Sequence, residues 1–401
     1  MKTIAFHIYA IILLSLGASE FYSAKATPLI AIRESENCAG CHKPGRSQRP
    51  FIWRRCTLDC QGCHIDPNGA GARNQWGVYY SKDQLNIKEF FTPIDPLDDK
   101  SRGDLHYDGR IISRSLAGED VTSPMSSEYT FRLRPLINWL HLTYSAVFLG
   151  RTDDKTFRFG PNKRYFREKY NIMVDALPMN LYLKYGRGAP LYGQRRPNHS
   201  AWIRERIGLD QFATTDSFSF GGTLNVPFIH FSLLEGDPYK EEEDRQKGTS
   251  SHFGMRGVSF GWNVHASLWD TKSEKTAVEM SAVGGGAHIF NVLLMGERNF
   301  RKVTELQNSA STISGFDHPG TYSHPSSTIS EYTLAWTGMK GLMVGITDEN
   351  MKTETSSSKR RSYFVDVHPI PSVQLEFWRR QETGERNIWD TLAVFHVYGD
   401  F

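Results

Sequence analysis

Two short cysteine and histidine motifs lie close together near the start of the chain. The first is Cys38-Ala39-Gly40-Cys41-His42 and the second is Cys60-Gln61-Gly62-Cys63-His64. C-x-x-C-H is the attachment signature of c-type haem, in which two thiols add to the haem vinyl groups and the adjoining imidazole ligates the iron. The sequence therefore predicts two c-type haems, attached through Cys38, Cys41, Cys60 and Cys63 and ligated by His42 and His64.

A structural zinc site is the alternative use of these cysteines. Residues 42–59 separate the two pairs, a spacing that also suits a four-cysteine zinc ribbon. A zinc ribbon needs no histidine after the second cysteine of each pair, yet both pairs have one, so haem is the preferred interpretation. Cys56 is left over, and we assign it no role.

Residues 1–26 resemble a cleaved secretory signal. Lys2 supplies a positive charge, Ile4–Leu16 an apolar stretch, and Ala24-Lys25-Ala26 a cleavage site. A membrane anchor is the alternative, although the apolar stretch is short for a span. Export would bring the chain to the compartment in which haem is attached.

Composition limits the remaining possibilities. The 401 residues contain 47 Lys plus Arg against 44 Asp plus Glu, and this balance gives no argument for nucleic acid. All five cysteines lie within 38–63, which is not the spread of a disulfide framework. No later run of apolar residues is long enough for a membrane helix, so a soluble fold and an outer-membrane β-barrel both remain possible.

Residues 27–104 form the predicted haem segment. It is rich in Gly, Pro, Arg and Asp and is too small to bury two haems by itself. The proline-containing stretch 92–104 is the expected boundary with the rest of the chain.

From residue 105 to 401 the apolar residues follow a period of two, which is typical of β-strands. Tyr129, Phe131 and Leu133 share one face of their segment, and Gly257–Leu268 shows the same alternation. The pattern predicts about 14–16 strands. We expect tight turns near 177–178, 338–341 and 369–371, and long polar connections at 188–200, 236–252, 302–326 and 351–360.

Short turns alternating with long loops, together with a final strand ending in Phe401, favour a transmembrane antiparallel β-barrel over a soluble all-β sandwich. The lumen of such a barrel is wider than its side chains can fill. The haem segment is expected to lie in this lumen or at its periplasmic mouth, where the wall shields the haems.

Each haem iron also needs a second axial ligand or an open position. The candidates are the first histidine after the motifs and the histidines that alternate with apolar neighbours on strands, namely His106, His141, His265 and His396. A polar lumen residue or a proton-titrating group is the alternative role for each of them.

The layout resembles the fused cytochrome–porin proteins of bacteria that exchange electrons with extracellular substrates. The resemblance rests on Cys38–His42, Cys60–His64, Phe401 and the order of the two parts. Residues 63–74 also resemble stretches in dihaem outer-membrane proteins of bacteria with extracellular respiration. The best-known fusions carry one haem, so the second motif is a departure.

This resemblance implies electron transfer across the outer membrane, without bond-making catalytic residues. A periplasmic cytochrome or other carrier and an extracellular redox substrate such as iron are the implied partners. Two other functions fit the sequence. The chain could be an outer-membrane porin with a structural or sensory amino-terminal plug, or a soluble periplasmic dihaem enzyme such as a peroxidase.

Overall fold

The computed structural model describes most of the chain from Gly103 onward. The described residues are 103–116, 119–133, 140–149, 166–177, 181–194, 201–209, 213–223, 227–257, 262–289, 291–306, 326–339, 342–370, 373–384 and 387–400. The predicted signal, the two C-x-x-C-H motifs and Phe401 therefore lie outside the described residues.

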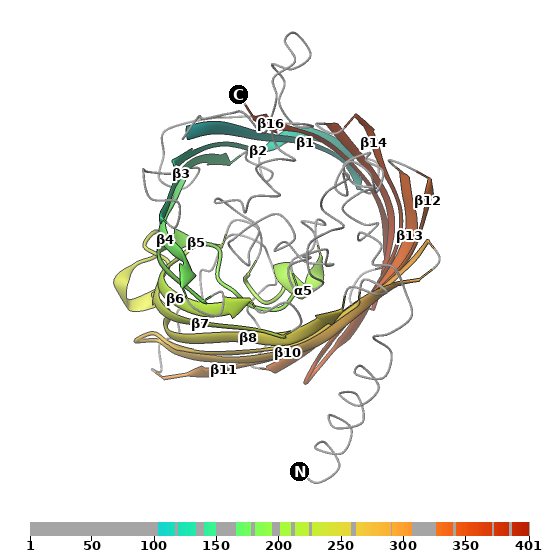
Figure 1. The fold of residues 1–401 in the computed structure, drawn as a ribbon. Helices are drawn as coiled ribbons and strands as arrows, with labels where there is room; N and C mark the ends of the chain where they lie inside the picture. Colours follow the sequence, from blue (N-terminus) through green and yellow to red (C-terminus); the bar gives the residue numbers. More distant parts are fainter. Residues whose placement is uncertain are drawn as a thin grey trace.

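Sixteen antiparallel strands form a closed barrel (Figure 1). Each strand pairs with its neighbours in the chain, and β1 also pairs with β16. The strands are β1 (Gly103–Leu116), β2 (Glu119–Leu133), β3 (Leu140–Leu149), β4 (Phe166–Leu177), β5 (Leu181–Gly188), β6 (Thr215–Thr223), β7 (Pro227–Gly236), β8 (Lys247–Gly257), β9 (Trp262–Lys272), β10 (Thr276–Ile289), β11 (Val292–Glu305), β12 (Ser326–Met339), β13 (Leu342–Thr353), β14 (Ser357–Ile370), β15 (Val373–Thr383) and β16 (Ile388–Asp400). The predicted barrel class is confirmed, and the observed number of strands is at the upper end of the expected range.

The two faces of the barrel wall have opposite polarity, because alternate side chains point to opposite faces of a strand. Large apolar side chains point outward and remain exposed, for example Ile229 at 61% and Tyr332 at 59%. Charged and polar side chains point inward and are buried, for example Arg256 and Glu297 at 1% each. An apolar outside around a polar inside is the pattern of a membrane-spanning barrel rather than of a soluble sandwich.

The strand connections differ between the two ends of the barrel. At one end, the chain enters β1 and leaves β16, and the connections span only 134–139, 178–180, 224–226, 258–261, 290–291, 340–341 and 371–372. We call this the short-turn end. The opposite end, which we call the long-loop end, carries the connections 150–165, 189–214 and 306–325. The three predicted tight turns all fall at the short-turn end.

Some predicted connections were wrong. The segment 351–360 is no long loop, because β13 continues to Thr353 and β14 starts at Ser357. The loop expected at 236–252 is shorter, because β8 already starts at Lys247. Gly257–Leu268 is not one strand, since β8 ends at Gly257 and β9 starts at Trp262. Ser, Thr and Lys residues at the strand ends gave the first two regions the composition of loops, whereas in the third the alternation continued across the turn.

The connection from β5 to β6 turns into the barrel. It contains the short helix α5 (Trp202–Glu205), which lies inside the ring of strands (Figure 1). The sequence predicted a long polar loop at 188–200, and it did not predict this inward course. A second short helix, η5 (Glu242–Asp244), lies in the β7–β8 connection. Neither helix in the described part of the chain has the length or apolar character to cross a membrane.

Candidate functional site in the barrel lumen

Among the side chains that the structure describes, seven inward-facing histidines lie in the half of the barrel toward the short-turn end or, for His252, at mid-strand opposite His230, and we call them the histidine collar. Five of them are buried, with exposed fractions between 1% and 7%, and the other two are intermediate. The predicted haem segment precedes β1, so the chain enters the barrel from that segment at this same end. The collar consists of His106 (β1), His141 (β3), His230 (β7), His252 (β8), His265 (β9), His368 (β14) and His396 (β16).

Three collar histidines on neighbouring strands form a continuous row. The rings of His230 and His252 are stacked, with centroids 6.0 Å apart and an interplanar angle of 11°. The ring of His252 lies 5.3 Å from that of His265. The row ends at hydrogen-bonding partners on both sides: the Tyr182 hydroxyl lies 3.0 Å from His230 Nδ1, and Glu297 Oε2 lies 3.2 Å from His265 Nε2. The wall therefore holds a connected row of four polar rings, on β5, β7, β8 and β9, that ends at the Glu297 carboxylate on β11.

His396 is tied into a different network on β16. Its Nδ1 lies 2.9 Å from Gln374 Oε1, and its Nε2 lies 3.0 Å from Asp108 Oδ2. The amide nitrogen of Gln374 donates to the carboxylates of Asp366 and Glu376, which fixes the amide oxygen toward His396. Both ring nitrogens of His396 thus have hydrogen-bonding partners on neighbouring strands.

Three glutamates on adjacent strands lie side by side on the lumen face of the barrel wall. Glu297 on β11 is opposite Glu331 on β12, which is opposite Glu349 on β13, and their exposed fractions are 1%, 3% and 2%. Like charges on neighbouring strands repel unless other groups compensate them. Arg360 compensates Glu349 through two hydrogen bonds of 2.5 and 2.9 Å. Glu297 accepts from Asn299 Nδ2 at 2.8 Å.

Two of these glutamates, Glu297 and Glu349, also bind the chain segment that enters the lumen. We call residues 189–194 and 201–209 the inward segment. The backbone N–H of Gln194 donates to Glu297 at 2.5 Å, and that of Trp202 donates to Glu349 at 2.6 Å. Two buried carboxylates thus hold the two described parts of the segment against β11 and β13.

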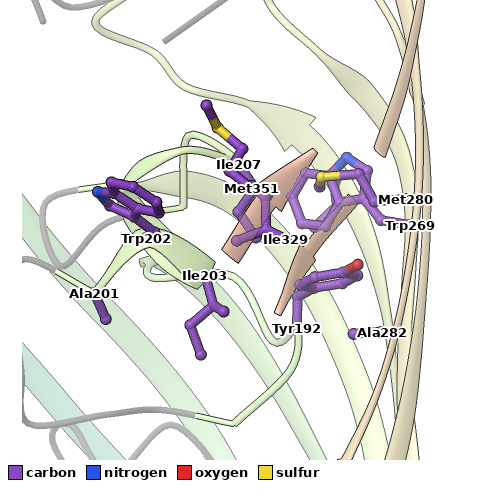
Figure 2. Packing of buried hydrophobic residues seen from close by; sticks show 11 residues of the cluster. Tyr192, Ala201, Trp202, Ile203, Ile207, Trp269, Met280, Ala282, Ile329 and Met351 are labelled. Atoms are coloured by element: carbon purple, nitrogen blue, oxygen red, sulfur yellow. The ribbon is translucent and has the colours of Figure 1, made fainter. Parts of the chain in front are cut away.

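Apolar packing adds to these hydrogen bonds. Tyr192, Trp202 and Ile203 are at most 1% exposed, and they belong to one cluster with wall residues such as Ile329 and Met351 (Figure 2). Burying a large apolar side chain stabilises a fold by about 1.5–3 kcal/mol. The inward segment is therefore a packed part of the barrel interior. Burial also raises the pKa of the Tyr192 phenol, so this side chain stays neutral.

Gly193 explains how the inward segment approaches the wall so closely. Its φ is +58°, and a Cβ at this position would lie 2.5 Å from Glu297 Oε1. Its backbone N–H also donates to Ser267 Oγ at 2.8 Å. Only glycine combines this backbone conformation with such a short approach.

Replacing Glu349 with alanine is expected to destabilise the barrel strongly. The buried Arg360 guanidinium and the Trp202 N–H would both lose their acceptor. Removing one partner of a buried ion pair costs about 3–5 kcal/mol. The measurement is urea unfolding of the purified barrel in lipid vesicles, followed by tryptophan fluorescence.

The neighbouring residue provides a matched control. Asp348 and Arg361 form the equivalent ion pair between the same two strands, but on the outward, exposed face. Solvent screens such pairs, so Asp348→Ala should leave the urea midpoint nearly unchanged. Equal midpoints for the Glu349→Ala and Asp348→Ala variants would contradict the anchoring role of Glu349.

The sequence-predicted ligand candidates face the lumen as expected, but they do not form one cluster. His141, His265 and His396 are buried inward residues, whereas His106 is half-buried on β1. His265 lies on β9, across the ring from β1 and β16 (Figure 1). The predicted attachment residues Cys38, Cys41, Cys60 and Cys63 and the predicted ligands His42 and His64 lie outside the described residues.

Sequence reasoning missed several lumen residues. His252 was assigned to the predicted loop at 236–252, although it lies inside β8. The inward face of β7 also carries Phe228 and Leu234, so both faces of the strand contain apolar residues and the alternation around His230 was hidden. The inward positions of Glu297 and Glu349 follow from strict alternation on β11 and β13, which could have identified them.

The described ranges contain no group of three or more His, Cys, Asp or Glu side chains that could hold a metal ion. The histidine row explains why, since stacked rings do not direct their nitrogens toward one point.

The fold is similar to that of outer-membrane β-barrels of known structure. OmpT of Vibrio cholerae with loop L8 deleted superposes with a TM-score of 0.54 at 11% identity, covering 75% of this chain and 100% of that chain. Outer-membrane expressed OmpT of the same organism gives 0.53 at 10% identity, with 75% and 99% covered. OmpF of Salmonella typhi in complex with daunomycin gives 0.50 at 10% identity, with 75% and 97% covered. No protein-family model and no curated protein sequence matches the chain. The chain thus has the fold of a porin-like outer-membrane barrel.

Proposed function

We propose that the chain is an outer-membrane β-barrel that shields a covalently attached dihaem segment, residues 27–104, and passes single electrons across the membrane. The observation that carries the proposal is the histidine collar, because it lies at the end of the barrel where the segment with the two C-x-x-C-H motifs joins β1. Bound haems would supply reversible one-electron exchange. The electron donor or acceptor inside the cell would be a periplasmic carrier, and its counterpart outside a redox substrate such as iron.

The orientation of the barrel supports this arrangement. Outer-membrane barrels have short periplasmic turns and longer extracellular loops. By this rule the short-turn end, with the entry to β1, faces the periplasm. Export by the predicted signal and haem attachment in the periplasm are consistent with this orientation. The polar wall and the inward segment would then separate the haem segment from lipid and from the outside.

The collar residues differ in how well they suit a bound haem. An iron ligand must present a ring nitrogen that is not protonated. His396 directs both ring nitrogens at acceptors, so it would have to break a hydrogen bond before it could ligate iron. His265 pairs only Nε2 with Glu297, but it lies on β9, across the ring from β1. His106 and His141 are nearest in sequence to the haem segment and lie on β1 and β3. These two are the collar members that we expect to ligate iron.

Replacing His141 with alanine is expected to convert one of the two haems from low spin to high spin, because its iron would lose an axial ligand. The measurement is the absorption and electron paramagnetic resonance spectrum of the purified full-length protein. His230→Ala is the matched control, since His230 is equally inward but is paired with Tyr182. If neither His141→Ala nor His106→Ala changes the spin state, these two collar histidines do not ligate the haems.

Passive solute diffusion is the second candidate function. The likeness to OmpT and OmpF and the charged lumen wall favour it. In this case residues 27–104 would act as a structural or sensory plug. The two functions predict different behaviour of the intact protein in liposomes.

One experiment separates them. The full-length protein is produced with the c-type haem attachment machinery and inserted into liposomes that enclose ferricytochrome c, and dithionite is added outside. Covalent haem with reduction of the enclosed cytochrome, but no leakage of an enclosed sugar, supports electron transfer. Absence of covalent haem together with sugar leakage supports the porin and overturns the proposal.

A further inference from the structure

A groove on the outer surface of the barrel lies close to the long-loop end. Its volume is about 1140 Å³, and it extends across the outward faces of β8 to β13. Small hydroxyl side chains form its floor, including Ser251, Ser281 and Ser330, whereas longer side chains such as Phe300 and Tyr332 stand at its sides. The groove therefore arises from side-chain length, because small outward residues lie between large ones on neighbouring strands.

Polarity changes along the strands at this groove. Toward the short-turn end, the outward residues of the same strands are apolar and exposed, for example Val283 at 53%, Leu294 at 48% and Leu334 at 50%. Toward the long-loop end they are charged or carry hydroxyl groups, such as Lys302 and Thr328. An apolar zone directly beside a polar zone suits an amphiphile, whose acyl chains would contact the apolar residues and whose headgroup would contact the polar ones.

The polar zone has a cationic side centred on β12. Three outward hydroxyl residues of β12, Ser326, Thr328 and Ser330, each lie opposite a cationic residue on a neighbouring strand. Ser330 is opposite Arg298, Ser326 is opposite Lys302, and Thr328 is opposite Lys352. Adjacent strands are about 4.8 Å apart, so one phosphate could contact cations from both sides.

Carboxylates occupy the other side of the groove. Asp270 on β9 and Glu279 on β10 lie directly opposite each other, and both line the groove. The cations of β11 and β13 flank the hydroxyl groups of β12, and Arg298 also packs over the Phe300 ring at 4.8 Å. The cationic part of the groove therefore lies on β11–β13, where the lining also includes one carboxylate, Glu354, which accepts a hydrogen bond from Ser326 Oγ at 2.7 Å.

We propose that this groove binds the phosphorylated saccharide headgroup of an anionic glycolipid in the outer leaflet. Arg298, Lys302 and Lys352 would bind the phosphate, and the hydroxyl groups of β12 would bind the sugar. The acyl chains would lie on the exposed apolar residues below. The site depends on the outer-membrane setting and orientation of the proposed function, but not on haem.

The test compares purified full-length protein with the triple variant Arg298→Glu, Lys302→Glu, Lys352→Glu. Both are extracted in a mild non-ionic detergent and incubated with purified lipopolysaccharide, and bound glycolipid is counted by native mass spectrometry. We expect one bound glycolipid per barrel, and at least a tenfold weaker affinity in the variant, since charge-assisted contacts to phosphate are strong. A triple glutamine variant serves the same purpose if the glutamate variant fails to fold, which heat-modifiable migration on gels reports.

Arg379→Glu is the matched control. Arg379 is also outward, and it packs over the Trp389 ring at 5.0 Å, as Arg298 does over Phe300, but it lies on β15, away from the groove. This variant should bind glycolipid like the unmodified protein. An equal loss of glycolipid affinity in the Arg379→Glu variant and in the triple variant would show a general charge effect and overturn the site. Equally tight binding of phosphatidylglycerol would overturn it as well, because the saccharide would then play no part. A barrel that binds no haem but keeps the groove affinity would contradict the proposed function and leave this site supported.

Discussion

Replacing Cys60 and Cys63 with serine is expected to reduce the covalently bound haem from two to one per chain and to abolish electron transfer across liposome membranes. Without both thiols the second C-x-x-C-H motif cannot form its thioether bonds, and His64 is left without a fixed iron to ligate. If the haems act in series, losing one breaks the chain of electron steps. Haem content is measured by the pyridine haemochrome spectrum, and transfer by reduction of enclosed cytochrome c.

Cys56→Ser is the control for this prediction. Cys56 lies four residues before Cys60 and belongs to neither motif. This variant should keep two haems and full electron transfer. A Cys60→Ser, Cys63→Ser protein that still carries two haems would show that Cys56 takes part in attachment, whereas unchanged electron transfer with one haem would mean that the second haem is not on the electron path.

Replacing Trp202 with alanine is expected to detach the inward segment from the lumen wall. Trp202 is 1% exposed, and its ring packs in the cluster with Ile329 and Met351 and beneath the Arg360 guanidinium at 4.8 Å. Truncation of a buried tryptophan costs about 3–5 kcal/mol. Urea unfolding should show this loss, and ion conductance in planar bilayers should rise because the segment no longer fills part of the lumen.

Trp389→Ala is the control that shows whether the rise in conductance requires the loss of a tryptophan inside the lumen. Trp389 is 44% exposed on the outward face of β16, so its removal deletes no interior packing. The conductance of the Trp389→Ala variant should equal that of the unmodified protein. If Trp202→Ala lowers stability but leaves conductance unchanged, the inward segment does not limit passage through the lumen.

The alternation of apolar and polar residues was sufficient to predict the barrel class and the approximate strand number. It worked because every strand has one lipid-facing and one lumen-facing side, so the period of two extends through β9, β14 and β15 with few interruptions. The orientation of His141, His265 and His396 followed from the same alternation.

The inward segment could not be predicted from the sequence. Residues 189–209 contain glycine, proline and several charged residues, which is also the composition of an exposed loop. Glu297 and Glu349, which are far away in the sequence, accept the hydrogen bonds that hold Gln194 and Trp202 inside the barrel. A single sequence does not reveal such distant contacts. The histidine collar was likewise found only in part, because strand ends must be known before residues can be assigned to one end of a barrel.

The pairing of β1 with β16 has a consequence for biogenesis. The seam runs from His106 opposite Asp400 to Leu116 opposite Asp390, and it is reinforced by His396 with Asp108 and by Arg114 with Asp390. Its contacts join residues up to 294 positions apart, from His106 to Asp400. Such distant contacts are slow to form, and open sheet edges are not tolerated in lipid. The ring can therefore close only after β16 has been made, so a chain truncated during synthesis would remain an open sheet that proteases can recognise.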